Sequence, residues 1–374
     1  MSRLTRLAAS LSLSLLVGAA LSGCPGGGDG VGFVGVSEPQ KPAGPPPVKH
    51  LTIEVNGDLL IHSPIWNLAL QQGGGTTYDF NPMLALVKPT IEKADLAVCH
   101  VETPMSNRPP TGFPIFNTPE QLAGAIRATG WDVCDTASNH SLDGGQEGID
   151  STVAALDRAG VRHTGSYATA AGPETPLILN VKGTKIAWLA YTEMTNGIPL
   201  PHPYSVGIAS APRILADARR AKAAGAQAVI VNLHAGAENQ SQPSDFQTNI
   251  VRQLVASPDI TAVVGQHVHV VQPIEMVGGK FVVFGEGNFL SNQTPNCCPA
   301  ASQDGIIGLL HLTAQGSKVR VDKVDYIPVW VRHPDFVVVP VSLGLAKGLA
   351  PADELRASWN RTTSVVGTSV AKPR

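Results

Sequence analysis

Residues 260–269, ITAVVGQHVH, contain a short apolar run that ends directly in polar side chains. The same arrangement occurs in residues 51–58, LTIEVNGD, in residues 96–102, LAVCHVE, and in residues 228–234, AVIVNLH. Short β-branched and apolar runs of this kind are typical of buried strands. Because functional sites in α/β proteins form at the carboxyl ends of the strands, we expect the polar residues after these runs to gather there.

Longer amphipathic segments separate many of these runs, and most of them are followed by a strand. This alternation predicts an α/β protein with parallel-type pairing in the first two-thirds of the chain. In the last third, strand follows strand, and the alternating pattern of residues 318–326 favours antiparallel pairing. We therefore expect two mixed sheets flanked by helices. The predicted strands are 51–61, 95–102, 132–137, 185–192, 228–234, 260–265, 281–285, 305–313 and 319–331, and the predicted helices are 82–93, 119–129, 145–158, 211–224 and 245–256.

Residues 1–23 are predicted to be a lipoprotein signal peptide. Arg3 and Arg6 precede an apolar run over residues 7–20, which is too short to span a bilayer. The run ends in Leu21-Ser22-Gly23-Cys24, which is typical of a lipobox with Cys24 as the acylated residue. The alternative is an ordinary secretory leader with a coincidental cysteine. Lipidation predicts an exported protein of the cell envelope, anchored to the periplasmic or extracellular face of a membrane.

Residues 24–49 are rich in Pro and Gly and show no apolar period, so they are interpreted as a tether. The globular domain is expected to cover residues 50–345, and residues 346–374 are expected to form a short helix and a frayed tail. With 43% hydrophobic residues, the chain can bury a large core. Its 27 basic and 29 acidic residues are nearly balanced, which excludes the basic composition of a nucleic-acid-binding protein.

The cysteines downstream of the tether carry no zinc signature, because the chain has no C-x-x-C motif. Cys99 and Cys134 fall in apolar strands, where cysteine is expected to act as a small hydrophobe. Cys297 and Cys298 lie in a polar loop; a vicinal disulfide and a metal-binding pair are the alternatives to a plain loop.

Residues with the chemistry of metal ligands follow six of the predicted strands. Imidazole suits transition metals, and carboxylate or amide oxygens can complete the coordination shell. Purely structural or solvent-exposed roles are the alternatives: Asp58 could cap a turn, Glu102 could be a surface carboxylate, and His62 could be an exposed loop residue. The candidates are Asp58, His62, Glu102, Asn139, His140, His234, His267 and His269, with supporting roles open for His100, Glu238, Glu286 and Asn288.

His267 and His269 are two residues apart, and on a strand this spacing places both rings on one side. Both rings could then reach one metal centre. If a carboxylate bridges, two metals ~3.5–4 Å apart could share a nucleophile.

At these residues the chain resembles the CapA capsule-synthesis (poly-γ-glutamate) family, which is related to the calcineurin-like metallophosphoesterases. The similarity runs in order over residues 50–291. The segments that carry it are Val55 to His62, Ala94 to Pro104, Thr136 to Gly145, Leu233 to Glu238, Gly265 to Pro273 and Phe284 to Phe289. The resemblance implies a metallophosphoesterase-like four-layer α/β/β/α sandwich with mixed sheets.

The resemblance also implies roles for the candidate residues. Asp58, His62, Glu102 and His269 would bind one divalent metal, and Glu102, Asn139, His234 and His267 would bind the other. The metals would be Mn, Fe or Zn. His140 would be the acid that protonates a leaving group, which requires a pKa near neutrality.

Four positions depart from the family pattern. His100 stands where the family usually has Asn, Ala235 where it has Trp, Gln266 where it has His, and Glu286 where it has Leu. These departures concern the wall of the pocket and the residues that support the ligands. In addition, Glu102 stands where phosphoesterases usually have a bridging Asp, and no Arg lies beside the motifs to bind phosphate.

Three functional hypotheses follow. The first is a metal-dependent hydrolase or transferase that acts on an anionic polymer such as poly-γ-glutamate during its synthesis, export or anchoring, with membrane synthetase subunits as candidate partners. The second is a metal-independent acid/base enzyme, such as an epimerase. The third is a lipoprotein that assembles polymer without catalysis.

Overall fold

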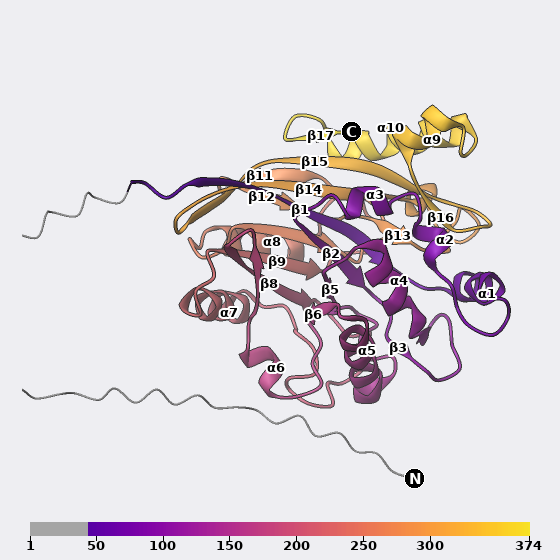
Figure 1. The fold of residues 1–374 in the computed structure, drawn as a ribbon, viewed down its shortest axis with the longest axis horizontal. Coiled ribbons are helices and arrows are strands. Elements are labelled where there is room, and N and C mark those ends of the chain that lie inside the picture. Colours follow the sequence, from indigo (N-terminus) through magenta and orange to yellow (C-terminus); the bar gives the residue numbers. More distant parts are fainter. Residues whose placement is uncertain (1–43) are drawn as a thin grey trace, which may run out of the picture. The chain divides into compact units, whose positions relative to one another are not determined.

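The computed structural model describes residues 44–374, and residues 46–374 form one compact unit. Two large sheets dominate it (Figure 1). The first sheet has the order β16 (Val337–Pro340), β15 (Lys318–Arg332), β14 (Asp304–Gln315), β1 (Val48–Leu59), β2 (Leu96–Val101), β5 (Val133–Asp135) and β6 (Arg162–Thr164), with β13 (Asn288–Leu290) beside β1 and β17 (Ala371–Pro373) beside β15. The second sheet has the order β11 (Ile274–Val277), β12 (Lys280–Val283), β10 (Ala262–Gln266), β9 (Ala228–His234), β8 (Thr184–Thr192) and β7 (Leu177–Val181).

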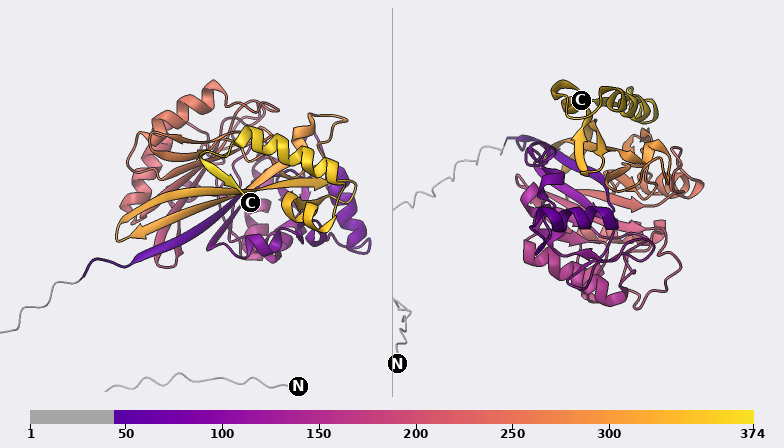
Figure 2. Two further views of the ribbon diagram at one scale, coloured as in Figure 1. Left: turned by 90° about the horizontal axis from the view of Figure 1, so that it is seen from above. Right: turned by 90° about the vertical axis from the view of Figure 1, so that its right-hand side faces the viewer.

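The two sheets pack face to face through one apolar layer. Ile53, Val55 and Val98 of the first sheet belong to the same buried cluster as Trp188 and Ile230 of the second. Helices cover both outer faces (Figures 1 and 2). The first sheet is covered by α1 (Ser63–Gln72), α2 (Asn81–Leu84), α3 (Lys88–Ile91), α4 (Gln121–Thr129) and α5 (Gly145–Ala159), and the second by α7 (Ala211–Ala223) and α8 (Asp245–Val255). The predicted four-layer α/β/β/α sandwich is therefore confirmed.

Parallel pairing is found where the alternation of strands and helices predicted it. The strands β1, β2, β5 and β6 are parallel, and so are β8, β9, β10 and β12. The later strands β14, β15 and β16 pair antiparallel. Every residue of β9 is buried, which explains why its sequence is a nearly continuous apolar run.

Local sequence explains where the helices differ from expectation. The predicted helix 82–93 is split into α2 and α3, and Pro89 lies in the first turn of α3. Proline is tolerated there but cannot donate the backbone hydrogen bond that would continue a preceding helix. The helix α1 was not predicted. Three further short elements are the helix α6 (Ala171–Glu174) and the paired strands β3 (Met105–Ser106) and β4 (Thr118–Pro119).

The C-terminal segment has two helices where one short helix was expected, and a paired strand where a frayed tail was expected. The helices α9 (Val341–Lys347) and α10 (Ala352–Val366) pack on β15, and β17 pairs in parallel with that strand. Arg361 of α10 binds the buried Asp304 through two hydrogen bonds, of 2.7 Å from Nε and 2.9 Å from Nη2. The burial of that carboxylate makes its guanidinium partner necessary.

The cysteines of the neighbouring strands β2 and β5 also differ from expectation. Cys99 and Cys134 are register partners and are joined by a disulfide, rather than acting as free small hydrophobes. Cys297 and Cys298 lie in a loop with their sulfur atoms 2.50 Å apart. Cys24 and the predicted signal peptide lie outside the described residues. Within residues 44–374, no helix is both long and apolar enough to cross a membrane.

The Arg361–Asp304 contact yields a prediction about stability. Arg361→Ala should lower the free energy of unfolding by about 3 kcal/mol, because it leaves the buried Asp304 carboxylate without a partner. Urea unfolding measures this change. The matched control is Arg320→Ala, which breaks an exposed pair with Asp322 and should cost less than about 1 kcal/mol. Equal effects of the two variants would contradict the role of Arg361 as the partner of a buried carboxylate.

Candidate metal centre

Polar side chains from both sheets meet at the carboxyl ends of the parallel strands. Asp58, near the end of β1, stands at their centre: its register partners are His100 on β2 and Asn288 on β13. The strand β9 ends in His234, and the loop after β10 carries His267 and His269. The sequence thus brings its candidates together because strands of both sheets end at the same edge.

Gly57 allows the backbone to approach closely at this edge. A Cβ atom at position 57 would collide with the carbonyl oxygen of Gly287. The adjacent Asp58 amide donates a 3.0 Å hydrogen bond to the same oxygen. A larger residue at position 57 would push β1 away from this segment and displace the Asp58 carboxylate.

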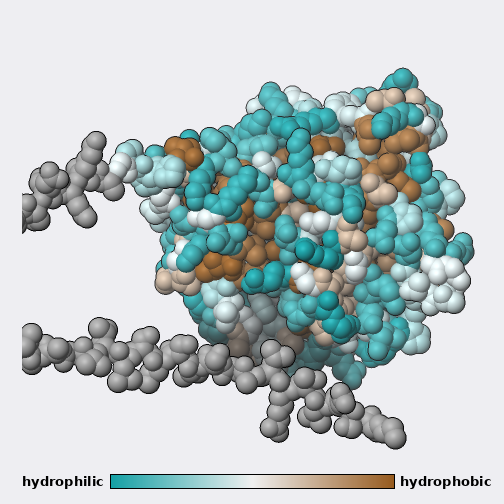
Figure 3. Space-filling view, viewed as in Figure 1, coloured by the Kyte–Doolittle hydropathy of each residue, from teal (hydrophilic) through white to brown (hydrophobic). Residues whose placement is uncertain are grey.

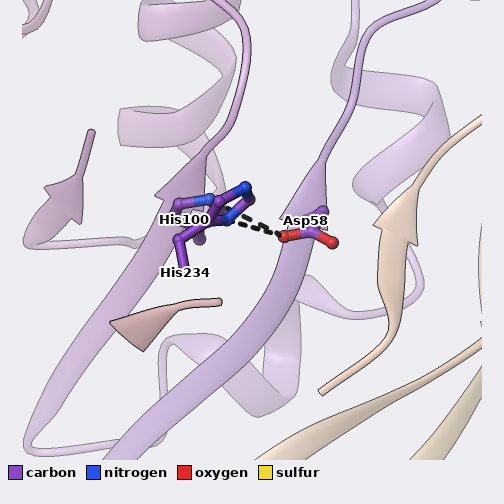
Figure 4. Close-up of side chains that lie close together, drawn as sticks. All are labelled: Asp58, His100 and His234. Atoms are coloured by element: carbon purple, nitrogen blue, oxygen red, sulfur yellow. Dashed lines mark ion pairs between the residues drawn. The ribbon is translucent and has the colours of Figure 1, made fainter. Parts of the chain in front are cut away.

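The two oxygens of Asp58 face different groups of side chains. Oδ1 lies 3.6 Å from His100 Nε2 and 3.8 Å from His234 Nδ1, and these two rings stack at 4.7 Å (Figure 4). Oδ2 lies 3.2 Å from Nδ1 of His269, whose Nε2 is 3.8 Å from Glu102 Oε1. Two potential ligand sets result, Asp58–His100–His234 and Asp58–Glu102–His269. The residue common to both sets is Asp58, whereas the family resemblance had implied Glu102.

A third set of contacts surrounds the other nitrogen of His234. Its Nε2 lies 2.8 Å from Asn139 Oδ1 and 3.1 Å from His267 Nδ1. Asn139, His234 and His267 therefore lie together, as the ligand set implied by the resemblance requires. Glu102, the fourth residue of that set, is grouped instead with Asp58 and His269.

Several buried atoms of the candidate ligands have no hydrogen-bond partner among residues 44–374. They are both carboxylate oxygens of Glu102, Nε2 of His100 and Nδ1 of His234. A buried polar atom without a partner costs about 1–3 kcal/mol, and more when it is charged. Divalent cations accept nitrogen and oxygen donors of these types, so the donor set fits a metal.

His100 is held by a network that links the two sheets. Its Nδ1 contacts the carboxylate of Asp135 on β5, which leaves Nε2 facing Asp58. Asp135 also accepts hydrogen bonds from the second sheet, of 2.9 Å from Asn232 Nδ2 and 3.3 Å from Trp188 Nε1. A carboxylate that fixes the ring and tautomer of a histidine is the usual support of a metal ligand.

The sequence reasoning missed Asp135, and it treated His100 as a residue with at most a supporting role. The available signal was a carboxylate within the apolar run of residues 132–137, where a charged residue requires a partner.

The rings of His267 and His269 converge for a different reason than expected. The strand β10 ends at Gln266, so both histidines lie in a turn rather than on a strand. Both have left-handed backbone conformations, with φ of 94° and 58°. Such conformations are unfavourable for histidine and are concentrated at functional sites. The prediction from strand periodicity was therefore wrong in its physical basis, although the ring centroids lie only 6.1 Å apart.

His140 lies beside the ligand groups and is oriented by its own carboxylate. Its Nδ1 lies 2.8 Å from Asp143 Oδ2, and its ring packs edge-on against Phe116 at 4.7 Å. Burial lowers the pKa of His140, but the hydrogen bond to Asp143 and the charge of Glu102 raise it overall. The raised pKa favours the protonated ring, which is the form that a proton donor requires.

The remaining candidates lie around this centre. His62 occupies the N-cap position of α1 without a side-chain capping hydrogen bond. Its ring lies 5.5 Å from that of Phe116, and it belongs to neither carboxylate-containing set. Glu238 is exposed. The Oδ1 atom of Asn288 lies 3.1 Å from Nδ1 of His269. Glu286 is fully buried and accepts a 2.7 Å hydrogen bond from Gln266. Gln266 and Glu286 are two of the four positions that depart from the family pattern, and they contact each other.

Comparison with known proteins identifies the class. Residues 52–293 match the family described as bacterial capsule synthesis protein PGA_cap, and this match spans more than half of the 374 residues. The chain therefore belongs to that family of capsule synthesis proteins.

Two curated relatives are similar to the chain. The capsule biosynthesis protein CapA of Bacillus anthracis is 24% identical over 304 residues, which cover 77% of this chain and 70% of the relative. The PGA biosynthesis protein CapA of Bacillus subtilis (strain 168) is 24% identical over 244 residues, which cover 63% of this chain and 62% of the relative.

Solved structures with a similar arrangement include phosphoesterases. The calcineurin-like phosphoesterase YfkN from Bacillus subtilis matches with a TM-score of 0.49 and 15% identity, over 84% of this chain and 100% of that chain. A 5'-nucleotidase precursor from Thermus thermophilus matches with a TM-score of 0.49 and 12% identity, over 84% of this chain and 59% of that chain. These values are too low to transfer any property of those proteins to this chain.

The electrostatics of the centre generate a prediction about pH. Burial lowers the pKa values of His100 and His269, but Asp135 and Glu102, respectively, together with Asp58, raise each of them to about 9. The folded protein therefore holds protons that the unfolded chain releases above pH ~6.5. In protein stripped of divalent cations, the free energy of unfolding should fall between pH 7 and pH 9, on the order of 1 kcal/mol per pH unit for each group.

Urea unfolding at a series of pH values measures this dependence, and His100→Gln should flatten it. The lowered pKa values of His62 and His267, about 4 because of burial, act only below this window. Stability that is constant or rises between pH 7 and pH 9 would disprove the proposed charge states.

Proposed function

We propose that the chain is a metal-dependent hydrolase or transferase that acts on capsule polymer at the cell envelope, anchored to a membrane through Cys24. Its membership in a capsule synthesis family supports a role in capsule synthesis. The predicted signal peptide and lipobox support the proposed anchoring to a membrane. An anionic polymer such as poly-γ-glutamate is the proposed substrate, and membrane synthetase subunits are the proposed partners.

The observation that carries the proposal is the convergence of unpartnered buried ligand atoms on Asp58. We infer two cations, because the two oxygens of Asp58 face separate groups. One cation would be held by Asp58, His100 and His234, and the other by Asp58, Glu102 and His269. Nitrogen and oxygen donors of this kind suit Mn, Fe or Zn.

Divalent cations at this centre would polarise the bond to be cleaved and neutralise an anionic substrate. His140, held by Asp143, would donate a proton to the leaving group. The ring of Phe116 contacts the rings of both His140 and His62, and His140 is only 7% exposed, so little water reaches it.

One observation favours a second candidate, a metal-independent acid/base enzyme. His269 Nε2 and Glu102 Oε1 are 3.8 Å apart, and burial together with Asp58 raises the pKa of Glu102 to about 7. Such a pair could donate and accept protons near neutral pH without a metal. Metal content separates this candidate from the first.

Purified protein loaded with Mn, Fe or Zn should retain two equivalents per chain, measured by inductively coupled plasma mass spectrometry. Asp58→Ala should retain none, because it removes the carboxylate shared by both sets. Glu102→Gln should retain one. His50→Gln, which changes an exposed histidine far from Asp58 along β1, should retain both. If the unaltered protein retains no metal after loading, the acid/base candidate replaces this proposal.

His140→Ala should slow polymer cleavage or transfer by about 10²–10⁴-fold while metal content stays at two equivalents, because it removes a proton donor and no ligand. The measurement is the release of fragments from isolated capsule polymer, followed by chromatography. His50→Ala is the control. If both variants support normal capsule formation in cells that lack the native gene, a non-catalytic role in assembly is favoured instead.

A further inference from the structure

A cavity lies at the opposite end of the sheets from the candidate metal centre. It has a volume of about 470 Å³, and its lining includes the basic residues Lys222, Lys280, Lys318 and Arg320 but no acidic side chain. Gln227 and Thr261, which also line it, immediately precede β9 and β10. The same two strands end at His234 and Gln266, beside the centre. At ~3.3 Å per residue, β9 separates the two places by roughly 20 Å.

Nearby acidic residues neutralise only part of this charge. Arg320 pairs with Asp322 at 2.6 Å, and the charge of Asp259 acts on Lys280. Lys222 and Lys318 form no ion pair among residues 44–374, and Lys222 Nζ donates instead to the Gln227 carbonyl. The cavity therefore carries a net positive charge in a chain whose formal charge is −2. This balance favours an anionic ligand.

Exposed apolar side chains flank the basic cavity. Val48 is 51% exposed and is the register partner of Gln315, which lines the cavity. Met276 is 48% exposed and is the register partner of Phe281, another lining residue. Directly opposed residues of an antiparallel pair lie on the same face of the sheet. Basic and apolar side chains side by side are typical of surfaces that rest on lipid headgroups.

The chain also enters the domain at this end. Pro46 and Pro47 line a small cavity that shares Gln227 with the basic one. The start of β1 lies beside the tip of the β14–β15 hairpin, as Figure 1 and the left view of Figure 2 show. The surface of Figure 3 is viewed from the same side as Figure 1 and is mixed in polarity where these elements lie. A lipid attached upstream of residue 44 would therefore hold the domain by this end.

We propose that this basic end, defined as Lys222, Lys280, Lys318 and Arg320 with Val48 and Met276, docks on an anionic lipid surface. The metal centre then faces away from the membrane. This inference rests on the proposed membrane location but does not depend on the proposed chemistry. The long lysine side chains can place their ammonium groups at the headgroups while their alkyl stems lie along the apolar surface. Each basic residue near an anionic bilayer strengthens its binding.

The test uses residues 25–374, which contain the compact unit of residues 46–374 but lack both the predicted apolar leader and Cys24, so that neither a leader nor an acyl chain contributes to binding. Co-sedimentation with vesicles that contain phosphatidylglycerol should show binding that is absent with phosphatidylcholine alone and weakens at high salt. Lys222→Glu combined with Lys318→Glu should weaken it by about tenfold or more. The matched control, Lys347→Glu with Arg356→Glu, makes the same change of charge at exposed positions of α9 and α10 and should bind as before.

Equal binding of the two double variants would overturn the proposal. It would also be overturned if the Lys222/Lys318 variant lost binding to soluble poly-γ-glutamate but kept its binding to vesicles, because the cavity would then serve polymer. Metal content of the same samples is measured in parallel. It should be unchanged in both double variants, so a failure of the metal centre and a failure of membrane docking are distinguishable.

Discussion

The face-to-face packing of the two sheets is the constraint on which the centre depends. Asp58 and His100 come from the first sheet and His234 from the second, so their distances are set by the apolar layer between Val55, Val98 and Ile230. A packed interior is nearly incompressible, and a shift between the sheets would move His234 relative to both Asp58 and His100. The precision of the site therefore derives from the core rather than from the loops around it.

The polar network behind the centre extends this coupling. The Asp135 carboxylate contacts His100 of its own sheet and accepts hydrogen bonds from Asn232 and Trp188 of the other sheet. One carboxylate therefore connects the two sheets. Burying so many polar groups opposes folding, and the unpartnered atoms of Glu102 show that the network is not complete within the protein itself. A site that binds cations is expected to show this imbalance, because the cation supplies the missing interactions.

The fold also places the candidate metal centre and the basic cavity at opposite ends of the sheets. The carboxyl ends of the parallel strands carry the candidate metal centre, whereas the basic residues and the start of β1 lie at the other end. The two ends are joined by short, fully buried strands such as β9, so their relative orientation is fixed. If the chain is attached to a membrane at the basic end, as we propose, the candidate metal centre faces away from that membrane.

The sequence by itself determined the order of strands and helices, the class of the fold and most members of the centre, because apolar periodicity and residue type are local properties. It placed Asp58, Glu102, Asn139, His234, His267 and His269 near strand ends, where the structure has them. Only the tertiary structure decided that Asp58 is the shared carboxylate, that Asp135 orients His100, that His267 and His269 converge through a strained turn, and that Cys99 bonds to Cys134. These features depend on distances between strands that are far apart in the chain, and register and sheet packing set those distances only when the whole core forms.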